Sequence, residues 1–339
     1  MAPGIKDVAE AAGVSVATVS RALRGLPSVN KATMELVQHY ADELGFVRSA
    51  AAAAVATGHT MAVNVVVPSV STWFFASLIE GVDSQLRATG YDMALFDLGY
   101  NGKERERVFH RTLLRHRGDA VLALCLDFSE AERAELRATG MPTIVVGSPV
   151  RGLRFVGIDE VVAARMATDH LIALGHRDIF HISGGDETTL GLNPRVPHDR
   201  LEGYKQSLQA AGIPFRPEMV GLGRFTAAAS GQVMDQILDG PGPIPTAVFA
   251  VSDEMAMGAM LSIYRHGLKV PEDISVIGID NHALSASFRL TTVAQDPVEQ
   301  GVVATKIILD ELAGRQARKH SLLLPVEFID RGSTAPPRS

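Results

Sequence analysis

The sequence predicts a small all-α N-terminal domain followed by a larger α/β part built on parallel sheets. Short amphipathic segments around a glycine-centred turn open the chain, and from residue 61 onward strand-like apolar runs alternate with helical stretches. At 339 residues and 46% hydrophobic content, the chain is longer than one hydrophobic core usually supports. We therefore expect two or three folding units.

Residues 5–23, IKDVAEAAGVSVATVSRAL, have the pattern of two short helices joined by a tight turn. Gly13 can adopt the positive φ that ends a helix, and Ser15 is a good N-cap for a second helix beginning at Val16. One face of the first segment is apolar at helical spacing: Ile5, Val8, Ala9 and Ala12. This pattern predicts a helix-turn-helix, for which DNA is the first partner to consider.

In the second helix, Val19 and Leu23 are one turn apart and are expected to face inward. That leaves an outer face made of Val16, Ala17, Ser20 and Arg21. A third helix is expected from the N-cap Asn30 through Leu44, with Gly45 as its stop. Residues 1–60 carry five basic and five acidic side chains, so a basic footprint is missing. Spacing and charge alone leave open a helical domain that binds no nucleic acid.

Composition predicts a cytoplasmic protein. No apolar run approaches the roughly 18 residues that a membrane span needs, and the N-terminus lacks the basic and apolar regions of a signal peptide. The single cysteine, Cys125, lies in the apolar run AVLALCL and is expected to be a buried strand residue. The net charge of −6 is carried by residues 61–339, so this larger part is not expected to be a DNA-binding surface.

The larger part repeats a strand followed by a helix. The helical stretches include residues 77–90 and 163–175, and the strand-like runs are MAVNVVV, YDMALFD, DAVLAL, TIVVG, DIFHIS, TAVFAV and ISVIGI. Such alternation predicts parallel sheets covered by helices on both faces. Ligands of open α/β sheets bind at the carboxyl ends of the strands, where we expect a site.

Catalytic and metal-binding alternatives find little support. GLGRFT at 221–226 has two glycines of a dinucleotide loop, but Thr226 replaces the third, which favours a turn. His170 and His176 are six residues apart, unlike the four-residue spacing of helical zinc sites, and His176 follows a helix end. Nucleophile elbows, P-loops and cysteine pairs are absent from the sequence. We expect a binding module rather than an enzyme, with no cofactor and no metal.

The residues themselves resemble the LacI/GalR family of bacterial transcription regulators over nearly the full length. The resemblance lies in IKDVAEAAGVSVATVSRAL, VNKATMELV, TDHLIALGHRDI, DRLEGYKQSLQAAGI, PTAVFAVSDEMAMGAM, GLKVPEDISVIGIDN and LTTVAQD. It implies a helix-turn-helix headpiece at 1–47, a hinge helix at 48–60 and two periplasmic-binding-protein-like subdomains. These comprise 61–161 with 289–321, and 162–288 with 322–332, followed by a tail at 333–339. The chain would cross between them near residues 161, 288 and 322.

The resemblance also implies how the headpiece meets operator DNA. Val16, Ala17 and Arg21 would face the major groove, with Arg21 as the candidate for a bidentate contact to guanine. Residues implied to position the phosphate backbone are Ser15, Thr18, Ser20, Asn30 and Thr33. In the hinge, Val55 takes the place of the leucine that family members insert into the minor groove, and Ala53 replaces the usual arginine.

For the core, the resemblance implies a small-molecule effector held between the subdomains. The matching positions are Ser69, Trp73, Phe74, Phe75, Arg200, Phe225, Ser252 and Asp280. Each has an ordinary alternative: core packing for the aromatics, a solvated surface for Arg200, a helix cap for Ser252 and a turn for Asp280. The chain departs from sugar-binding members at Gly147, where they often carry aspartate, and in a longer, proline-rich segment at 187–198.

The expected function is a repressor of carbohydrate-utilisation genes that binds a pseudo-palindromic operator as a homodimer and responds to a sugar-like effector. A dimer is expected because the segment after residue 332 lacks a leucine heptad. The alternative is a corepressor-dependent or activating regulator with an effector such as a nucleobase. A periplasmic solute-binding protein would need a signal peptide, and an α/β enzyme would need a catalytic constellation.

Overall fold

A computed structural model describes residues 3–23, 28–46, 59–99, 102–108, 118–185, 195–315 and 321–338. The chain divides into two compact units, Met1–Met61 and Ala62–Ser339. These two units are the headpiece and the core. The predicted hinge residues Ala53 and Val55 lie outside the described residues.

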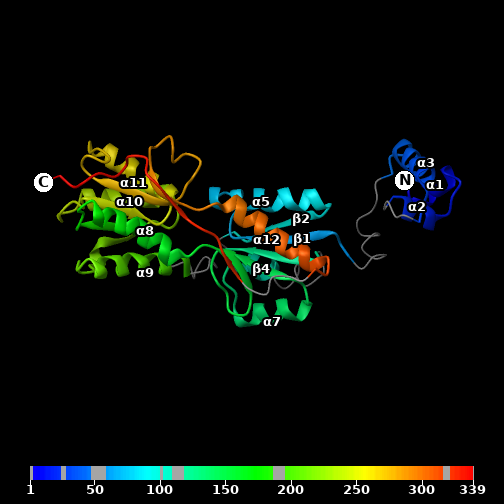
Figure 1. Ribbon diagram of the computed structural model, residues 1–339, viewed down its shortest axis with the longest axis horizontal. Helices are drawn as coiled ribbons and strands as arrows, with labels where there is room; N and C mark the ends of the chain where they lie inside the picture. Colours follow the sequence, from blue (N-terminus) through cyan, green and yellow to red (C-terminus); the bar gives the residue numbers. More distant parts are fainter. Residues whose placement is uncertain are drawn as a thin grey trace. The chain divides into compact units, whose positions relative to one another are not determined.

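The described part of the headpiece contains the helices α1 (Ile5–Ala11), α2 (Val16–Ala22) and α3 (Lys31–Glu43), as the sequence predicts (Figure 1). The Ser15 hydroxyl accepts a hydrogen bond from the Thr18 amide at 3.1 Å, and Asn30 caps α3. Both glycines at the helix ends, Gly13 and Gly45, have positive φ, 63° and 65°. The helices enclose a small apolar core of Val8, Ala9, Ala12, Val19, Ala22, Val29, Val37 and Ala41.

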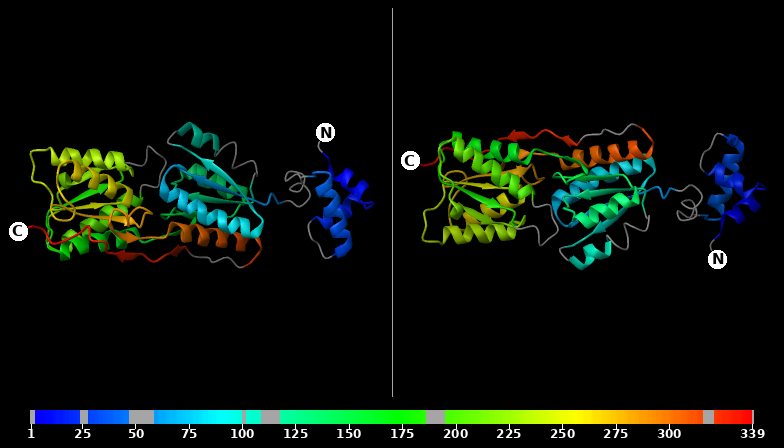
Figure 2. Two further views of the ribbon diagram at one scale, coloured as in Figure 1. Left: turned by 90° about the horizontal axis from the view of Figure 1, so that it is seen from above. Right: turned by 90° about the horizontal axis from the view of Figure 1, so that it is seen from below.

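The first sheet of the core has the strand order β11-β5-β4-β3-β1-β2, and all its neighbours are parallel. Its strands are β1 (Ala62–Val67), β2 (Asp92–Asp97), β3 (Ala120–Leu124), β4 (Thr143–Val146), β5 (Arg154–Gly157) and β11 (Leu322–Leu323). Its helices are α5 (Trp73–Thr89), α6 (Gly102–Arg107), α7 (Glu130–Thr139) and α12 (Pro297–Leu312). The α5 and α12 helices lie side by side although they are far apart in sequence (Figure 2). This approach requires Gly301, where a Cβ would lie 2.3 Å from the Leu78 carbonyl oxygen.

The second sheet has the order β12-β10-β9-β8-β6-β7, in which only the β10–β12 pair is antiparallel. Its strands are β6 (Ile179–Ser183), β7 (Val220–Leu222), β8 (Ala247–Ala250), β9 (Ser275–Asp280), β10 (Thr291–Ala294) and β12 (Glu327–Ile329). Its helices are α8 (Glu160–Ala173), α9 (Arg195–Ala210), the 3-10 helix η4 (Pro217–Met219), α10 (Ala227–Leu238) and α11 (Asp253–Arg265). The predicted fold class, an all-α headpiece with two parallel-sheet α/β subdomains, is confirmed.

The chain crosses between the two sheets three times. The first crossing lies between β5 and α8, just before residue 161, and the third follows Leu323 of β11, beside the expected residue 322. β10 pairs with β9, so the second crossing follows Ala294 and not residue 288. The sheet to which this short strand belongs is decided by pairing and not by its own sequence.

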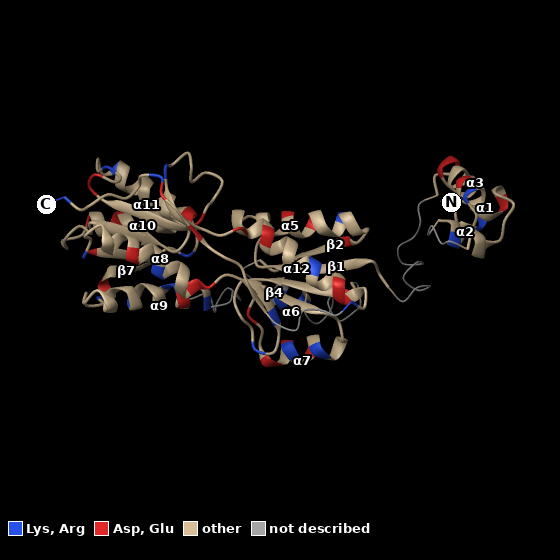
Figure 3. Cartoon of the chain, in the orientation of Figure 1, with Lys and Arg blue, Asp and Glu red and all other residues tan. Residues whose placement is uncertain are grey.

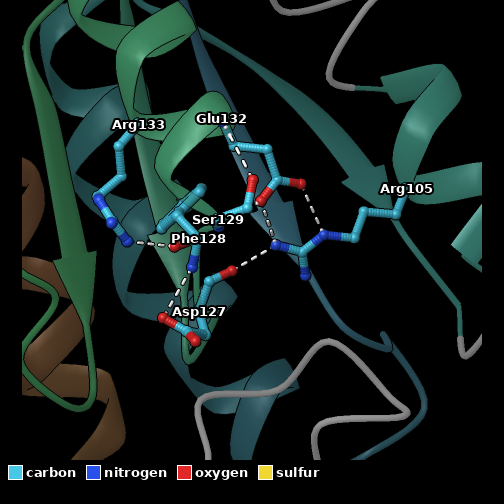
Figure 4. Close-up of polar contacts among 6 residues, drawn as sticks. All are labelled: Arg105, Asp127, Phe128, Ser129, Glu132 and Arg133. Atoms are coloured by element: carbon cyan, nitrogen blue, oxygen red, sulfur yellow. Dashed lines mark hydrogen bonds and ion pairs between the residues drawn. The ribbon is translucent and has the colours of Figure 1, made fainter.

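A polar cluster attaches α6 to the start of α7 (Figure 4). Arg105 makes a bidentate contact with Glu132, with Nε–Oε1 and Nη2–Oε2 distances of 2.8 and 2.9 Å, and Nη2 also donates to the Asp127 carbonyl. Glu132 belongs to a capping box with Ser129, whose amide donates to Oε2 at 2.8 Å. Arg105 and Ser129 together hold the pKa of Glu132 below its ordinary value although burial opposes this. These contacts connect α6 to α7.

His170 and His176 hold the C-terminal segment. His176 Nδ1 lies 2.9 Å from the Thr246 hydroxyl, and its Nε2 lies 2.9 Å from the Ala335 carbonyl oxygen. His170 Nε2 lies 2.8 Å from the Thr334 hydroxyl, and burial lowers the pKa of both rings. Within the described ranges, no group of three His, Cys, Asp or Glu side chains is placed to hold a metal ion, and no helix is long and apolar enough to cross a membrane.

Candidate functional site

A pocket of about 270 Å³ lies in the core at the carboxyl ends of strands from both sheets, where the sequence predicts a site. The first subdomain contributes the start of α5, the residues after β3 and β4, and Gln300 of α12. The second contributes the start of α8, part of α9, and the residues that follow β7, β8 and β9. A molecule held in this pocket would contact both subdomains at once.

An ion pair between two buried side chains forms one wall of the pocket. Arg200 is 3% exposed and Glu160 is 7% exposed, and Arg200 Nε donates to Glu160 Oε2 at 2.7 Å. Arg200 Nη1 donates to the Val251 carbonyl at the end of β8, while Nη2 has no hydrogen-bond partner in the described part of the chain. Arg200 is therefore not the solvated surface residue that was its ordinary alternative. Burial raises the pKa of Glu160, and Arg200 opposes this shift.

A relay of side-chain hydrogen bonds connects the two subdomains through the second crossing. Gln295 Nε2 donates to Asp280 Oδ1 at 2.7 Å, and Gln300 Nε2 donates to Gln295 Oε1 at 2.8 Å. All three side chains are buried, and Gln300 Oε1 has no partner among the described residues. Burial raises the pKa of Asp280 to about 8, although Arg200 favours its charged form.

Aromatic side chains also line the pocket. The Trp73 ring, at the start of α5, lies 4.5 Å from the His282 ring, which follows β9 in the second subdomain. Phe74 and Phe225 also line the pocket. Phe75 packs in the apolar cluster of the first sheet and also lines the pocket. Rings facing a cavity with a few polar groups are typical of small-molecule sites.

Gly147 and Cys125 shape the end of the pocket. Gly147 has a φ of 113°, and a Cβ there would lie 2.6 Å from Cys125 Sγ. The aspartate that sugar-binding members of the resembled family often carry therefore does not fit here without movement of the cysteine. Burial raises the pKa of the Cys125 thiol to about 12, which makes it unreactive as a nucleophile at neutral pH.

Asp253 fixes the segment that carries Asp280 and His282. Its carboxylate accepts hydrogen bonds from the hydroxyls of Ser285 and Thr292, each at 2.6 Å, and from the His282 amide at 2.9 Å. The neighbouring Ser252 caps α11, since its hydroxyl accepts from the Met255 amide at 3.3 Å, and it also lines the pocket. Ser252 therefore has the capping role that the sequence predicts, and it also lines the pocket.

Seven of the eight expected effector residues line this pocket, and Ser69 does not. The Ser69 hydroxyl lies 2.8 Å from the Ser71 hydroxyl and accepts from the Ser71 amide at 3.2 Å, so it orders its own loop. Sequence reasoning missed the polar side chains Glu160, Gln295, Gln300 and His282. A signal was available for Gln295, which follows a strand as Asp280 does.

The residues of GLGRFT support no dinucleotide loop. Residues 220–222 form β7, and Thr226 caps α10 by accepting from the Ala229 amide at 3.2 Å. Arg224 and Phe225 have positive φ, 50° and 52°, and both line the pocket. The segment is a turn, as expected, that turns the Phe225 ring toward the pocket's rim.

On the headpiece, the outer face of α2 is free to meet a partner. Val16 is 41% exposed, Ala17 and Arg21 are exposed, and Val19 below them is buried. Arg21 has no ion-pair or hydrogen-bond partner in the described part of the chain. Acidic and basic side chains mix over the three helices (Figure 3), and Lys31 lies 3.7 Å from Glu35. Ser15, Thr18, Asn30 and Thr33 lie at the capped N-termini of α2 and α3, and helix N-termini favour phosphate groups.

The sequence and the fold are similar to those of known regulators. A family model described as bacterial regulatory proteins, lacI family, matches residues 4–49, and one described as a periplasmic binding protein-like domain matches residues 168–334. The HTH-type transcriptional repressor CytR of Escherichia coli K12 is 37% identical over 337 residues, which cover 97% of this chain and 96% of CytR. The HTH-type transcriptional repressor PurR of Vibrio atlanticus is 32% identical over 337 residues, covering 97% of this chain and 98% of PurR.

Two solved structures are similar over almost the whole chain. The Lac repressor dimer bound to operator and the anti-inducer ONPF has a TM-score of 0.85 at 27% identity, covering 99% of this chain and 100% of that one. The complex of the transcriptional regulator CelR with cellobiose has a TM-score of 0.71 at 31% identity, covering 98% of this chain and 99% of that one.

Proposed function

The chain belongs to the LacI family of bacterial regulatory proteins, and we propose that it is a cytoplasmic repressor that binds operator DNA as a homodimer under the control of a small-molecule effector. The observation that carries this proposal is one chain with both an exposed α2 face and a pocket whose walls come from two subdomains. The relatives are named as transcriptional repressors, and no catalytic role is proposed for any residue.

DNA recognition is assigned to the face of α2. In this proposal Arg21 makes paired hydrogen bonds with guanine, and Val16 and Ala17 make apolar contacts such as those with a thymine methyl group. The cap residues Ser15, Thr18, Asn30 and Thr33, with Ser20, contact phosphates and set the register. A headpiece with so little net charge binds weakly alone, so two copies on a symmetric dimer are needed for useful affinity.

Control by the effector follows from the position of the pocket. Its two walls belong to different subdomains, so a ligand that contacts Trp73 or Gln300 on one side and Asp280 on the other favours one degree of closure. If that closure also differs in operator affinity, the ligand changes DNA binding by the same free energy.

The test is selection of bound duplexes from a random DNA library by the purified protein, with and without a pool of neutral sugars and nucleobases. We expect a two-fold symmetric motif whose recovery changes with one pool, and the direction of that change separates inducer from corepressor. Absence of an enriched motif under every condition would contradict sequence-specific recognition.

Arg21→Ala refines this test. It should weaken operator binding by about 1–3 kcal/mol and relax the preference at one base pair in each half-site. The matched variant Lys31→Ala also removes one positive charge from the headpiece, but it should change affinity equally for all sequences. Equal losses on operator and random DNA for Arg21→Ala would remove Arg21 from base recognition.

A further inference from the structure

The charge of the pocket's enclosed end is set by Glu160. An unpaired Arg200 would be a strong site for a phosphate or carboxylate group, because a guanidinium binds such groups with two parallel hydrogen bonds. In this chain, Arg200 Nε and Nη1 are already occupied by Glu160 Oε2 and the Val251 carbonyl. The N–H groups left for a ligand are the two of Nη2 and the second one of Nη1, and the positive charge beside them is balanced by a carboxylate.

One polar atom at this end is a free acceptor. Gln300 Oε1 is buried and unpartnered within the described residues. Asp280 Oδ1 already accepts from the Gln295 amide, and because burial raises the pKa of Asp280 to about 8, this carboxyl holds a proton at neutral pH. The relay fixes this polarity: Gln295 directs its NH2 group to Asp280, so its oxygen faces Gln300, and the Gln300 oxygen is left over. A buried acceptor without a donor is costly, so a ligand that donates there is favoured.

The other charged groups that line the pocket do not reverse this balance. Glu254 adds a third carboxyl group, and burial raises its pKa. Arg224 is the second cation, but it is exposed, so water screens its charge. Neither Glu254 nor Arg224 therefore adds a buried positive charge to the space walled by the Trp73 and His282 rings.

From the buried Arg200–Glu160 pair and the unpartnered Gln300 oxygen, we infer that the effector carries no negative charge and donates a hydrogen bond to Gln300. Suitable classes are uncharged polyols, ring compounds with hydroxyl or amine donors, and their protonated amine derivatives. Phosphorylated or carboxylated metabolites are excluded by Glu160. This inference rests on the proposed function, because it names the ligand class of the proposed effector pocket.

The first experiment needs no knowledge of the effector and uses inorganic sulfate as the probe. Thermal unfolding of the full-length protein is followed in millimolar sodium sulfate and in sodium chloride of matched ionic strength. Glu160→Gln keeps an oxygen for the Arg200 Nε–H but removes the balancing charge, so this variant should acquire a saturable stabilisation by sulfate, with an apparent affinity roughly tenfold or more above that of the wild type.

The double variant Glu160→Gln/Arg200→Gln is the matched control. It has the same neutral residue at 160 but no cation beside it, so the response to sulfate should disappear, whereas the general stabilisation of proteins by sulfate should remain. Saturable sulfate binding by the wild type as strong as that of Glu160→Gln would overturn the inference, and so would the absence of a gain in a folded Glu160→Gln protein.

The second experiment uses the unmodified protein, so it does not depend on how the variants fold. A bacterial small-metabolite extract is separated on an anion exchanger into a retained anionic fraction and an unretained neutral and cationic fraction. Each fraction is then tested for a shift in the melting temperature and in operator binding. We expect the unretained fraction to act, and Gln300→Met to weaken its effect at least tenfold, with Gln206→Met on the outer part of α9 as the matched control.

The outcomes separate the inference from the function on which it rests. Activity confined to the retained anions would overturn the charge inference and leave the proposed effector control in place. If neither fraction shifts the melting temperature or the operator binding, effector control itself fails, and the ligand class fails with it.

Discussion

Replacement of Asp280 by asparagine should stabilise the empty protein at neutral and alkaline pH. Asparagine has nearly the same shape and keeps an oxygen that can accept from Gln295 Nε2, but it cannot ionise. The buried carboxyl of Asp280 has a pKa of about 8, against an ordinary value of 3.8. Between these two values the folded state binds a proton that the unfolded state has released, so the wild type loses stability as the pH rises.

The size of the effect follows from 1.36 kcal/mol for each unit of pKa shift. A pH of 7 lies about three units above the ordinary pKa of 3.8, at which the unfolded carboxyl ionises, and below the pKa of the folded carboxyl. At this pH, Asp280 therefore lowers the free energy of unfolding by up to about 4 kcal/mol. The cost is nearly absent close to pH 4 and stops increasing above the folded pKa. Asp280→Asn removes this pH-dependent cost.

Urea unfolding of both proteins at pH 5 and pH 8 measures the effect directly. The stability of Asp280→Asn relative to the wild type should increase by up to about 4 kcal/mol between the two conditions. Because every other titrating group is common to both proteins, the comparison isolates position 280. An equal difference at both pH values, or a variant that becomes relatively less stable at pH 8, would refute the reasoning.

Three further substitutions test contacts outside the pocket. Ser15→Ala removes the cap of α2 and should cost the headpiece about 1 kcal/mol, seen as faster hydrogen exchange at the Thr18 amide, with unchanged exchange in the core. Arg105→Ala should destabilise the core by about 1–3 kcal/mol at pH 7, measured by urea unfolding. Since the pKa of Glu132 is lowered in the folded state, that loss should shrink as the pH falls below the ordinary value of 4.5, and a loss independent of pH would contradict the ion pair. His176→Ala removes hydrogen bonds to the C-terminal segment and should accelerate its proteolysis, whereas unchanged cleavage would assign the anchoring to other contacts.

The sequence predicts those features whose causes are local. The turn at Gly13 and the caps at Ser15 and Asn30 depend on neighbouring residues, and all three are present. The seven predicted strands are present because each is an apolar run long enough to be recognised. The remaining strands have two to four residues, and their sequences alone carry too little pattern to identify them.

The site is predictable only in part, for the same reason. Arg200 and Asp280 lie at positions that family resemblance indicates, but the partner of Arg200 is not readable from the chain. Glu160 begins α8 and meets Arg200 only because α8 and α9 pack against each other. Gln300 belongs to α12 and reaches Asp280 only through Gln295. Such pairings depend on tertiary packing. They balance the charge of Arg200 and leave Gln300 Oε1 as an acceptor without a partner among the described residues.

The threefold crossing of the core has a consequence for synthesis of the protein. The first sheet is completed by β11, and its face is covered by α12, yet both are encoded after the whole of β6 to β10. A ribosome therefore releases nearly all of the second subdomain before the first can bury the surface that α5 offers to α12. Nascent chains that stop before residue 297 should expose this surface and depend on chaperones, so late truncations should endanger solubility more than their length suggests.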